Sequence, residues 1–135
     1  MKKDVKLSGF TLVELMVVIM IVALLASLSI PIFRERTKQS KWTEGAATAG
    51  SIRKALRTYY AEDPIAAAAM AGSTVDTVQG TLGFFAGDLT GRYFQANNFT
   101  ITAIDGDGNA TITVAAPAGL SGSGVLSNAG WVYTP

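Results

Sequence analysis

The residue best suited to chemistry in this sequence is a glutamate at the start of a long apolar run. Glu14 is followed by nineteen residues, Leu15 to Phe33, that include no charged side chain. An acidic residue inside a membrane-embedded segment costs about 2.5 to 3.5 kcal/mol when it lies near the bilayer centre. Such a carboxylate either pairs with a cation or, near the end of the span, reaches the polar interface with its own side chain. The charge alone leaves both interpretations open.

The composition excludes most enzymatic chemistry. The sequence contains no Cys and no His, so it offers no disulfide, no thiol nucleophile, no Ser-His-Asp or Cys-His system and none of the usual zinc ligand sets. An enzyme would have to rely on carboxylates, Lys or Tyr alone. We therefore predict that the protein is not an enzyme and that it has neither catalytic residues nor a cofactor.

One acidic motif invites comparison with a calcium loop. Asp105, Asp107 and Asn109 alternate as oxygen ligands do, but the position that requires glycine is Ala110 and the acidic twelfth position is Ala116. Turn formation explains the run DGDGN without a metal. We predict no metal site.

The apolar run is long enough to cross a membrane. Nineteen helical residues extend for about 28 Å, close to the hydrocarbon thickness of a bilayer. Apolar side chains occupy every face, as expected for a helix surrounded by lipid or by other apolar helices. A core helix of a soluble protein is the alternative. Pro31 predicts a kink or a locally open turn, because proline lacks an N–H and crowds the preceding turn; it could equally mark the interface end of the span.

A different pattern follows from Arg34 onward. Apolar residues recur at intervals of three and four between Trp42 and Tyr59, which predicts an amphipathic helix. No turn signal separates this segment from the apolar run. We therefore predict one long helix of about fifty residues that ends near Asp63, because Pro64 follows. Gly45 and Gly50 weaken its middle by about 1 kcal/mol each relative to alanine.

The residues after this helix predict a small head. Residues 64–72 favour a short second helix, with proline at the start and glycine at the end. The glycine-punctuated segment that follows predicts an irregular loop, and four aromatic residues are candidates for its packed side: Phe84, Phe85, Tyr93 and Phe94.

Strand patterns are clearest near the C-terminus. Phe99, Ile101 and Ala103 alternate with polar positions, and a second alternating segment follows a turn at residues 105–109. GWVYTP, at the end, predicts a third short strand after the Gly- and Ser-rich loop of residues 118–124. The predicted fold class is α+β, with the long helix packed on a small antiparallel sheet of three strands.

Charge is distributed unevenly along the chain. Residues 34–57 hold seven basic and two acidic residues, whereas residues 63–135 hold Arg92 as their one basic residue against five Asp residues. A solvated surface is the ordinary explanation, and complementary contacts between stacked subunits are the functional one. The net charge is small, so no global basic field predicts nucleic-acid binding.

The start of the chain combines several of these features. A short Lys-rich leader ends in Gly9, Phe10 follows, Glu14 comes four residues later, and then the apolar run begins. This segment resembles the N-terminus of type IV prepilins and of the related pseudopilins. The resemblance covers roughly residues 6–40, and Pro31 matches a proline typical of the family.

The resemblance implies a processing step and an assembly step. A prepilin peptidase would cut between Gly9 and Phe10, the new N-terminus at Phe10 would be N-methylated, and Glu14 would be the fifth residue of the mature chain. A free amine at Phe10 and the carboxylate of Glu14 attract strongly in an apolar environment. We therefore expect Glu14 of one subunit to pair with the Phe10 amine of a neighbour.

The implied organisation has four parts. Residues 1–9 are the leader, residues 10–33 the membrane and assembly part of the helix, residues 34–63 its amphipathic part and residues 64–135 the head. The implied function is that of a structural subunit of a type IV pilus-like filament, and the close alternative is a pseudopilin of a type II secretion system. A single-pass membrane-anchored binding domain is the alternative of another class.

The resemblance also implies partners and a location. The partners are other copies of the chain, minor pilins, the prepilin peptidase, an inner-membrane assembly platform and, before assembly, membrane lipid. The precursor would lie in the bacterial inner membrane with its head outside the cytoplasm, and the product would be a surface pilus or a periplasmic pseudopilus.

Overall fold

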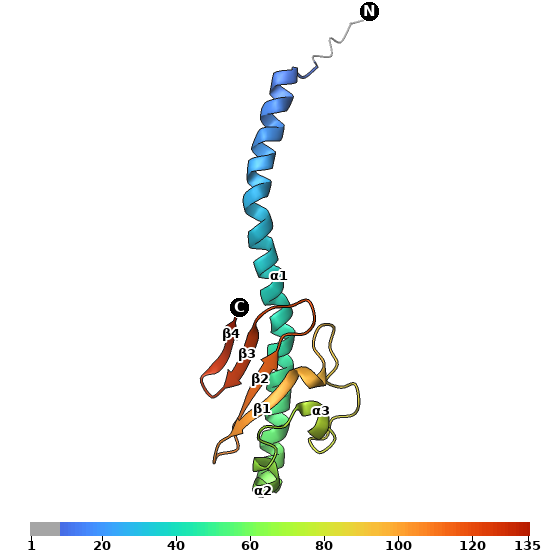
Figure 1. Ribbon diagram of the computed structural model, residues 1–135, viewed down its shortest axis with the longest axis vertical. Helices are drawn as coiled ribbons and strands as arrows, with labels where there is room; N and C mark the ends of the chain where they lie inside the picture. Colours follow the sequence, from blue (N-terminus) through green and yellow to red (C-terminus); the bar gives the residue numbers. More distant parts are fainter. Residues whose placement is uncertain (1–8) are drawn as a thin grey trace, which may run out of the picture. The chain divides into compact units, whose positions relative to one another are not determined.

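A computed structural model describes residues 9–135 (Figure 1). Most of the predicted leader, residues 1–8, lies outside the described residues. The chain divides into two compact units, Met1–Thr37 and Lys38–Pro135. We call them the N-terminal and the C-terminal unit.

The predicted long helix is confirmed. Helix α1 (Leu12–Glu62) has 51 residues, contributes to both units and continues through Pro31. It ends where predicted because Asp63 adopts an extended conformation and caps the next helix, α2 (Pro64–Ala68), by accepting a hydrogen bond from the Ala66 N–H at 3.0 Å.

The C-terminal unit contains one antiparallel sheet. Its strands follow the sequence order β1 (Phe99–Ile104), β2 (Ala110–Ala115), β3 (Ser123–Ser127) and β4 (Gly130–Thr134). A short helix, α3 (Val75–Val78), and a 3-10 turn at Ala96–Asn98 precede the sheet. The α+β class predicted from the sequence is confirmed, with the second half of α1 packed against the sheet (Figure 1).

The sheet has four strands where the sequence predicts three. Ser123–Ser127 forms β3 and pairs with both β2 and β4, whereas the sequence assigns its first two residues to a loop. Gly124 explains the difference, because the Trp131 ring of β4 lies where a Cβ of residue 124 would be. The glycine is therefore a packing position within a strand.

A register shift changes one face of β1. Ile101 pairs with Ile112, but Ala103 pairs with Thr111, so that Thr102 is an extra residue. Ala103 is consequently exposed and Ile104 is half-buried against the core. The sequence predicts Ala103 on the face of Phe99 and Ile101, and this prediction is wrong.

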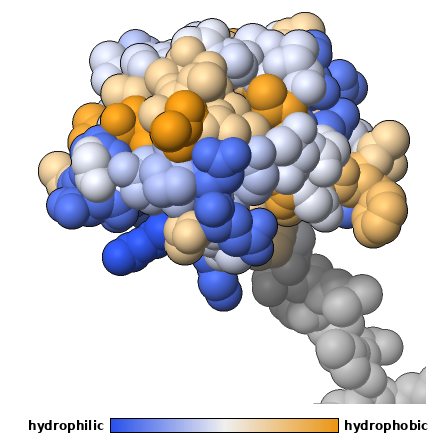
Figure 2. Space-filling view, turned by 90° about the horizontal axis from the view of Figure 1, so that it is seen from below, coloured by the Kyte–Doolittle hydropathy of each residue, from blue (hydrophilic) through white to orange (hydrophobic). Residues whose placement is uncertain are grey.

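The core of the C-terminal unit is aromatic and aliphatic. Trp42 lies 5.1 Å from the rings of both Phe94 and Tyr133, measured between centroids. Phe94 is fully buried and Phe84 and Tyr93 are half-buried, as predicted, but Phe85 is 80% exposed and its predicted burial is wrong. The outer surface of this unit is mixed, and Figure 2 shows hydrophilic side chains around smaller hydrophobic areas on one face.

A carboxylate fixes the loop that carries Phe94. Oε1 of Glu44 accepts hydrogen bonds from the backbone N–H groups of Tyr93 and Phe94 at 2.9 and 3.0 Å. Partial desolvation would raise the pKa of Glu44, but these donors, the Arg92 N–H and the Arg92 charge outweigh it and lower the pKa below its usual value of 4.5. Gly91 lets the carboxylate approach, because a Cβ at residue 91 would overlap it.

Candidate functional site

Helix α1 begins with a capped first turn. The Thr11 Oγ1 accepts a hydrogen bond from the Glu14 N–H at 3.2 Å, and the Thr11 carbonyl accepts one from the Leu15 N–H at 3.2 Å. Thr11 is therefore the N-cap, and Glu14 is the third helical residue. The spacing T-x-x-E is the capping-box pattern, so this role of Thr11 was readable in the sequence, although the prediction concentrated on Glu14.

The predicted processing bond lies before the helix. Gly9, Phe10 and Thr11 are outside any helix or strand and are exposed, and the Phe10 side chain is 84% exposed. A peptidase needs an accessible, non-helical backbone. The Gly9–Phe10 bond meets this requirement within the residues that the structure describes.

Residues 10–33 of the N-terminal unit present apolar side chains around the helix. Every large hydrophobic side chain of this unit from Phe10 to Phe33 is at least half exposed. The helix is long and apolar enough to cross a membrane, and none of its most apolar window is buried inside the described chain. Contiguous exposed apolar surface of this extent indicates contact with lipid or with other proteins.

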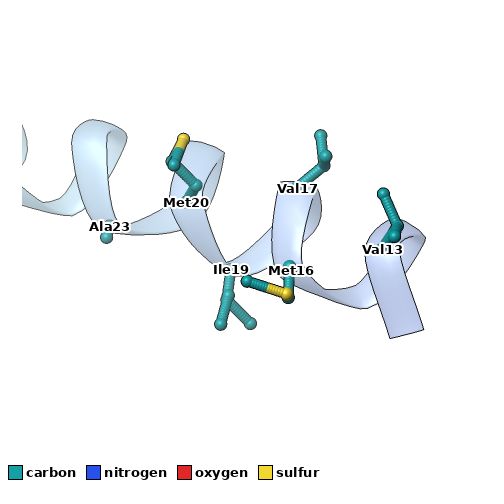
Figure 3. Close-up of a pocket in the computed structure, with 6 residues that line it drawn as sticks. All are labelled: Val13, Met16, Val17, Ile19, Met20 and Ala23. Carbon is teal, nitrogen blue, oxygen red and sulfur yellow. The ribbon is translucent and has the colours of Figure 1, made fainter.

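Part of this surface forms an open depression along the helix. Figure 3 shows six residues that line a shallow, open part of it, and all of them project from the same helix: Val13, Met16, Val17, Ile19, Met20 and Ala23. None of the six is polar. These six side chains offer apolar contact, which suits packing against another helix or against lipid.

The hydroxyl groups inside the apolar run bond to their own helix. Ser27 Oγ donates to the Leu24 carbonyl at 2.8 Å, and Ser29 Oγ donates to the Leu25 carbonyl at 2.9 Å. This back-bonding satisfies both hydroxyls without water. Both serines lie in the turn before Pro31, where α1 remains helical; the loosening of this region stays a prediction.

The acidic turn between β1 and β2 uses its carboxylate internally. Oδ1 of Asp105 accepts the N–H groups of Asp107 and Asn109 at 3.1 and 2.7 Å, and Oδ2 accepts the Asn128 amide at 2.9 Å. The Asn109 N–H and the Asn128 amide are the main causes that lower the pKa of Asp105. Turn geometry accounts for this motif, and residues 9–135 contain no cluster of three side chains suited to a metal.

The capped turn, the accessible Gly9–Phe10 bond and the exposed apolar helix coincide with a known motif. Residues 6–30 match the family model described as the prokaryotic N-terminal methylation motif. The resemblance to type IV pilins is confirmed to this extent, because the relatives found are type IV pilins and fimbrial proteins.

Relatives match beyond the motif to different extents. The chain is 28% identical over 106 residues to the fimbrial protein EcpC of Eikenella corrodens, a match that covers 78% of this chain and 61% of that protein. It is 38% identical over 52 residues to the type IV major pilin protein PilE1 of Neisseria gonorrhoeae, covering 38% of this chain and 32% of the pilin. A fimbrial protein of Neisseria meningitidis serogroup B matches similarly, with 31% of its length covered.

The matches thus span less than two thirds of the length of these relatives. No solved structure gives a significant match to this chain.

Proposed function

We propose that this protein is a structural subunit of a type IV pilus-like filament. One observation carries the proposal: the described part of the segment that matches the methylation motif is mostly an exposed, predominantly apolar helix, and its one acidic residue, Glu14, lies in the first turn. The relatives are pilins and fimbrial proteins, which favours a pilus over a secretion pseudopilus.

The proposed route has two steps. A prepilin peptidase cleaves the accessible Gly9–Phe10 bond and leaves an amine at Phe10, which is then methylated. Helices then leave the bilayer and pack against each other, so that the apolar side chains that contacted lipid contact neighbouring subunits instead. The exchange of one apolar environment for another needs no exposure of the helix to water.

Glu14 supplies the specificity of this packing. A methylated ammonium at Phe10 and the carboxylate of a neighbouring Glu14 would each be costly in the apolar shaft alone, and they neutralise one another when paired. The pair therefore fixes the axial position of one helix against the next. Further partners of the proposed function are minor pilins and an inner-membrane assembly platform, and the precursor would be a single-pass inner-membrane protein.

Immunoelectron microscopy of intact cells tests the proposal. Antibodies against the C-terminal unit should label filaments on the cell surface, and the sheared filament fraction should contain this chain. Deletion of the gene for the peptidase should abolish labelling while the uncut precursor accumulates in the membrane. A chain found only as a membrane-bound monomer in cells with active peptidase would contradict the proposal.

A further inference from the structure

A short stretch of α1 and the segment that follows this helix carry opposite charges. Residues 53–57 of α1 contain three cations and no carboxylate. Residues 63–91, which include α2, α3 and the following loop, contain three carboxylates and no Lys or Arg. We call these residues the acidic segment.

The three cations border a groove. Gly50, Arg53, Lys54 and Arg57 of α1 line it together with Asn109 of the β1–β2 turn, and its volume is about 220 Å³. We call it the basic groove. Gly50 helps to open it, because no atom lies within 4 Å of the position of its missing Cβ.

Arg53 forms a fixed wall of the groove, whereas Lys54 and Arg57 remain available for a partner. Nη1 of Arg53 donates to the Ser127 carbonyl at 2.9 Å, and Nη2 donates to the Asn128 side chain, which fixes Arg53 to the β3–β4 turn. Lys54 and Arg57 are exposed, and their charged groups make no hydrogen bond or ion pair with residues 9–135. The groove therefore presents two unpaired cations beside a fixed guanidinium.

One carboxylate of the acidic segment is equally available. Asp63 Oδ1 accepts the Ala66 N–H and Asp88 Oδ2 accepts the Phe85 N–H, so both serve local turns. The carboxylate of Asp76, in α3, is exposed and has no such partner in the described part of the chain. Helix α3 packs against β1, at the opposite edge of the sheet from β4, and Figure 1 shows α3 and the β3–β4 hairpin on different sides of α1.

We propose that the basic groove of one copy of this chain receives Asp76 of a second copy. The inference rests on the proposed function, because it names a contact between subunits of the filament. The groove and Asp76 are different surfaces on different flanks of the unit, so their contact is heterologous, and a heterologous contact that does not close on itself generates an open helical assembly.

The size of the cationic cluster favours a protein partner over nucleic acid. Affinity for a duplex depends on how many phosphates a protein neutralises, and the groove offers three cations, one of them engaged with its own chain. The acidic segment supplies a matching charge in every subunit.

Charge reversal in the full-length chain tests this contact. The first variant is K54E/R57E, the second is D76K, and the third combines all three substitutions. E62K is the matched control for D76K, because Glu62 is an exposed carboxylate at the end of α1, where a cation also suits the helix dipole. Sheared filaments are quantified relative to membrane-inserted chain, so that a fall in expression or folding is separated from a fall in assembly.

We expect K54E/R57E and D76K each to lower filament yield about tenfold, which corresponds to about 1.4 kcal/mol for each subunit contact. The combined variant should recover most of the loss, and E62K should match the wild type. Wild-type filaments should also fragment more when ionic strength rises from about 0.1 M to 1 M, which shortens the Debye length from about 10 Å to 3 Å.

Three results would overturn the contact: normal yield from both reversal variants, no recovery in the combined variant, or an equal loss with E62K. Filaments that form normally with K54E/R57E but lose affinity for DNA would assign the groove to nucleic acid instead. Wild-type cells without filaments would refute the proposed function itself, which is a separate outcome.

Discussion

At the scale of single residues, the position of Glu14 in the first turn of α1 sets what its charge gains from the helix. A carboxylate in the first turn of a helix gains about 0.3 to 1 kcal/mol from the helix dipole. Burial of that carboxylate in an apolar environment costs about 2.5 to 3.5 kcal/mol near a bilayer centre. The dipole therefore would not offset burial in the proposed filament shaft, where the Phe10 amine of a neighbour would be the cationic partner.

Glu14→Ala should separate membrane insertion from assembly. We expect the variant to insert normally, because the change makes the span more apolar. Its filament yield should fall to background, since the unpaired Phe10 amine would cost about 3 to 5 kcal/mol per subunit. Immunoblots of membrane and sheared fractions measure both quantities.

Thr11→Ala is the matched control in the same turn. It removes the hydroxyl that caps α1 by accepting the Glu14 N–H, at a cost of about 1 kcal/mol, but leaves the Glu14 carboxylate in place. Filaments should still form. A Glu14→Ala chain that assembles as well as Thr11→Ala would refute the pairing.

Glu44 has a structural role that is pH-dependent. Its pKa lies below the usual 4.5 because backbone donors stabilise the charged form, so the folded state binds its proton more weakly than the unfolded state. The charged carboxylate therefore contributes fully to the free energy of unfolding above pH 4.5. This contribution is lost as the pH falls through the lower pKa that Glu44 has in the folded state.

Glu44→Gln keeps an acceptor but removes the charge. At pH 7 we expect the free energy of unfolding to fall by about 1 kcal/mol, the difference between charge-assisted and neutral hydrogen bonds. The wild-type and variant values should converge below pH 4.5. Thermal unfolding of the detergent-solubilised chain, followed by the fluorescence of Trp42 and Trp131, measures this, with Glu62→Gln as the control. A difference in unfolding free energy between wild type and Glu44→Gln that stays unchanged at low pH would contradict the assigned role.

At the scale of elements, the two glycines in the second half of α1 differ in their surroundings. Gly45 is buried, and a Cβ there would lie 3.1 Å from the tip of the Phe94 ring. Gly50 is exposed, with no atom within 4 Å of its Cβ position. The sequence treats both as helix-weakening residues, but only the fold shows that Gly45 makes room for the core.

Alanine substitutions should therefore have different effects at these two positions. Gly50→Ala should stabilise the chain by about 1 kcal/mol through helix propensity alone. Gly45→Ala gains the same propensity but must displace a fully buried ring, so we expect no gain or a net loss. Thermal unfolding of the two variants provides the comparison, and equal stabilisation by both would show that Phe94 moves without cost.

The sheet shows what the sequence could predict and what it could not. The sequence predicts β1 and β2 from the alternation of apolar and polar residues, because one face of each strand is apolar over most of its length. It does not predict the bulge at Thr102, since the bulge arises from the pairing register with β2. Strand β3 was partly missed because its Gly124 resembles a loop residue until the position of the Trp131 ring is known.

At the scale of the whole molecule, the sequence predicts the candidate site better than it predicts the packing of the C-terminal core. Phe10, Glu14 and the apolar run lie close together in the sequence, so one local pattern contains the predicted processing bond, the helix cap and the apolar surface. The contacts of Trp42 with Phe94 and Tyr133 join residues far apart in the chain. Such contacts depend on the final packing, which no local spacing encodes.

The proposed function depends on that local pattern more than on the C-terminal unit. The C-terminal unit is held together by its own aromatic core, by Glu44 and by the Arg53 bonds to the β3–β4 turn. Its surface carries the charges that would arrange neighbouring copies. In the proposed filament, the apolar helix would supply the hydrophobic surface that joins them.

The N-terminus of the chain recovered from sheared filaments tests the central claim most directly. Peptide mass spectrometry should find a chain that begins at Phe10 with one methyl group on its amine. A chain that retains Met1, or that begins anywhere upstream of Phe10, would contradict processing and with it the pairing of Glu14.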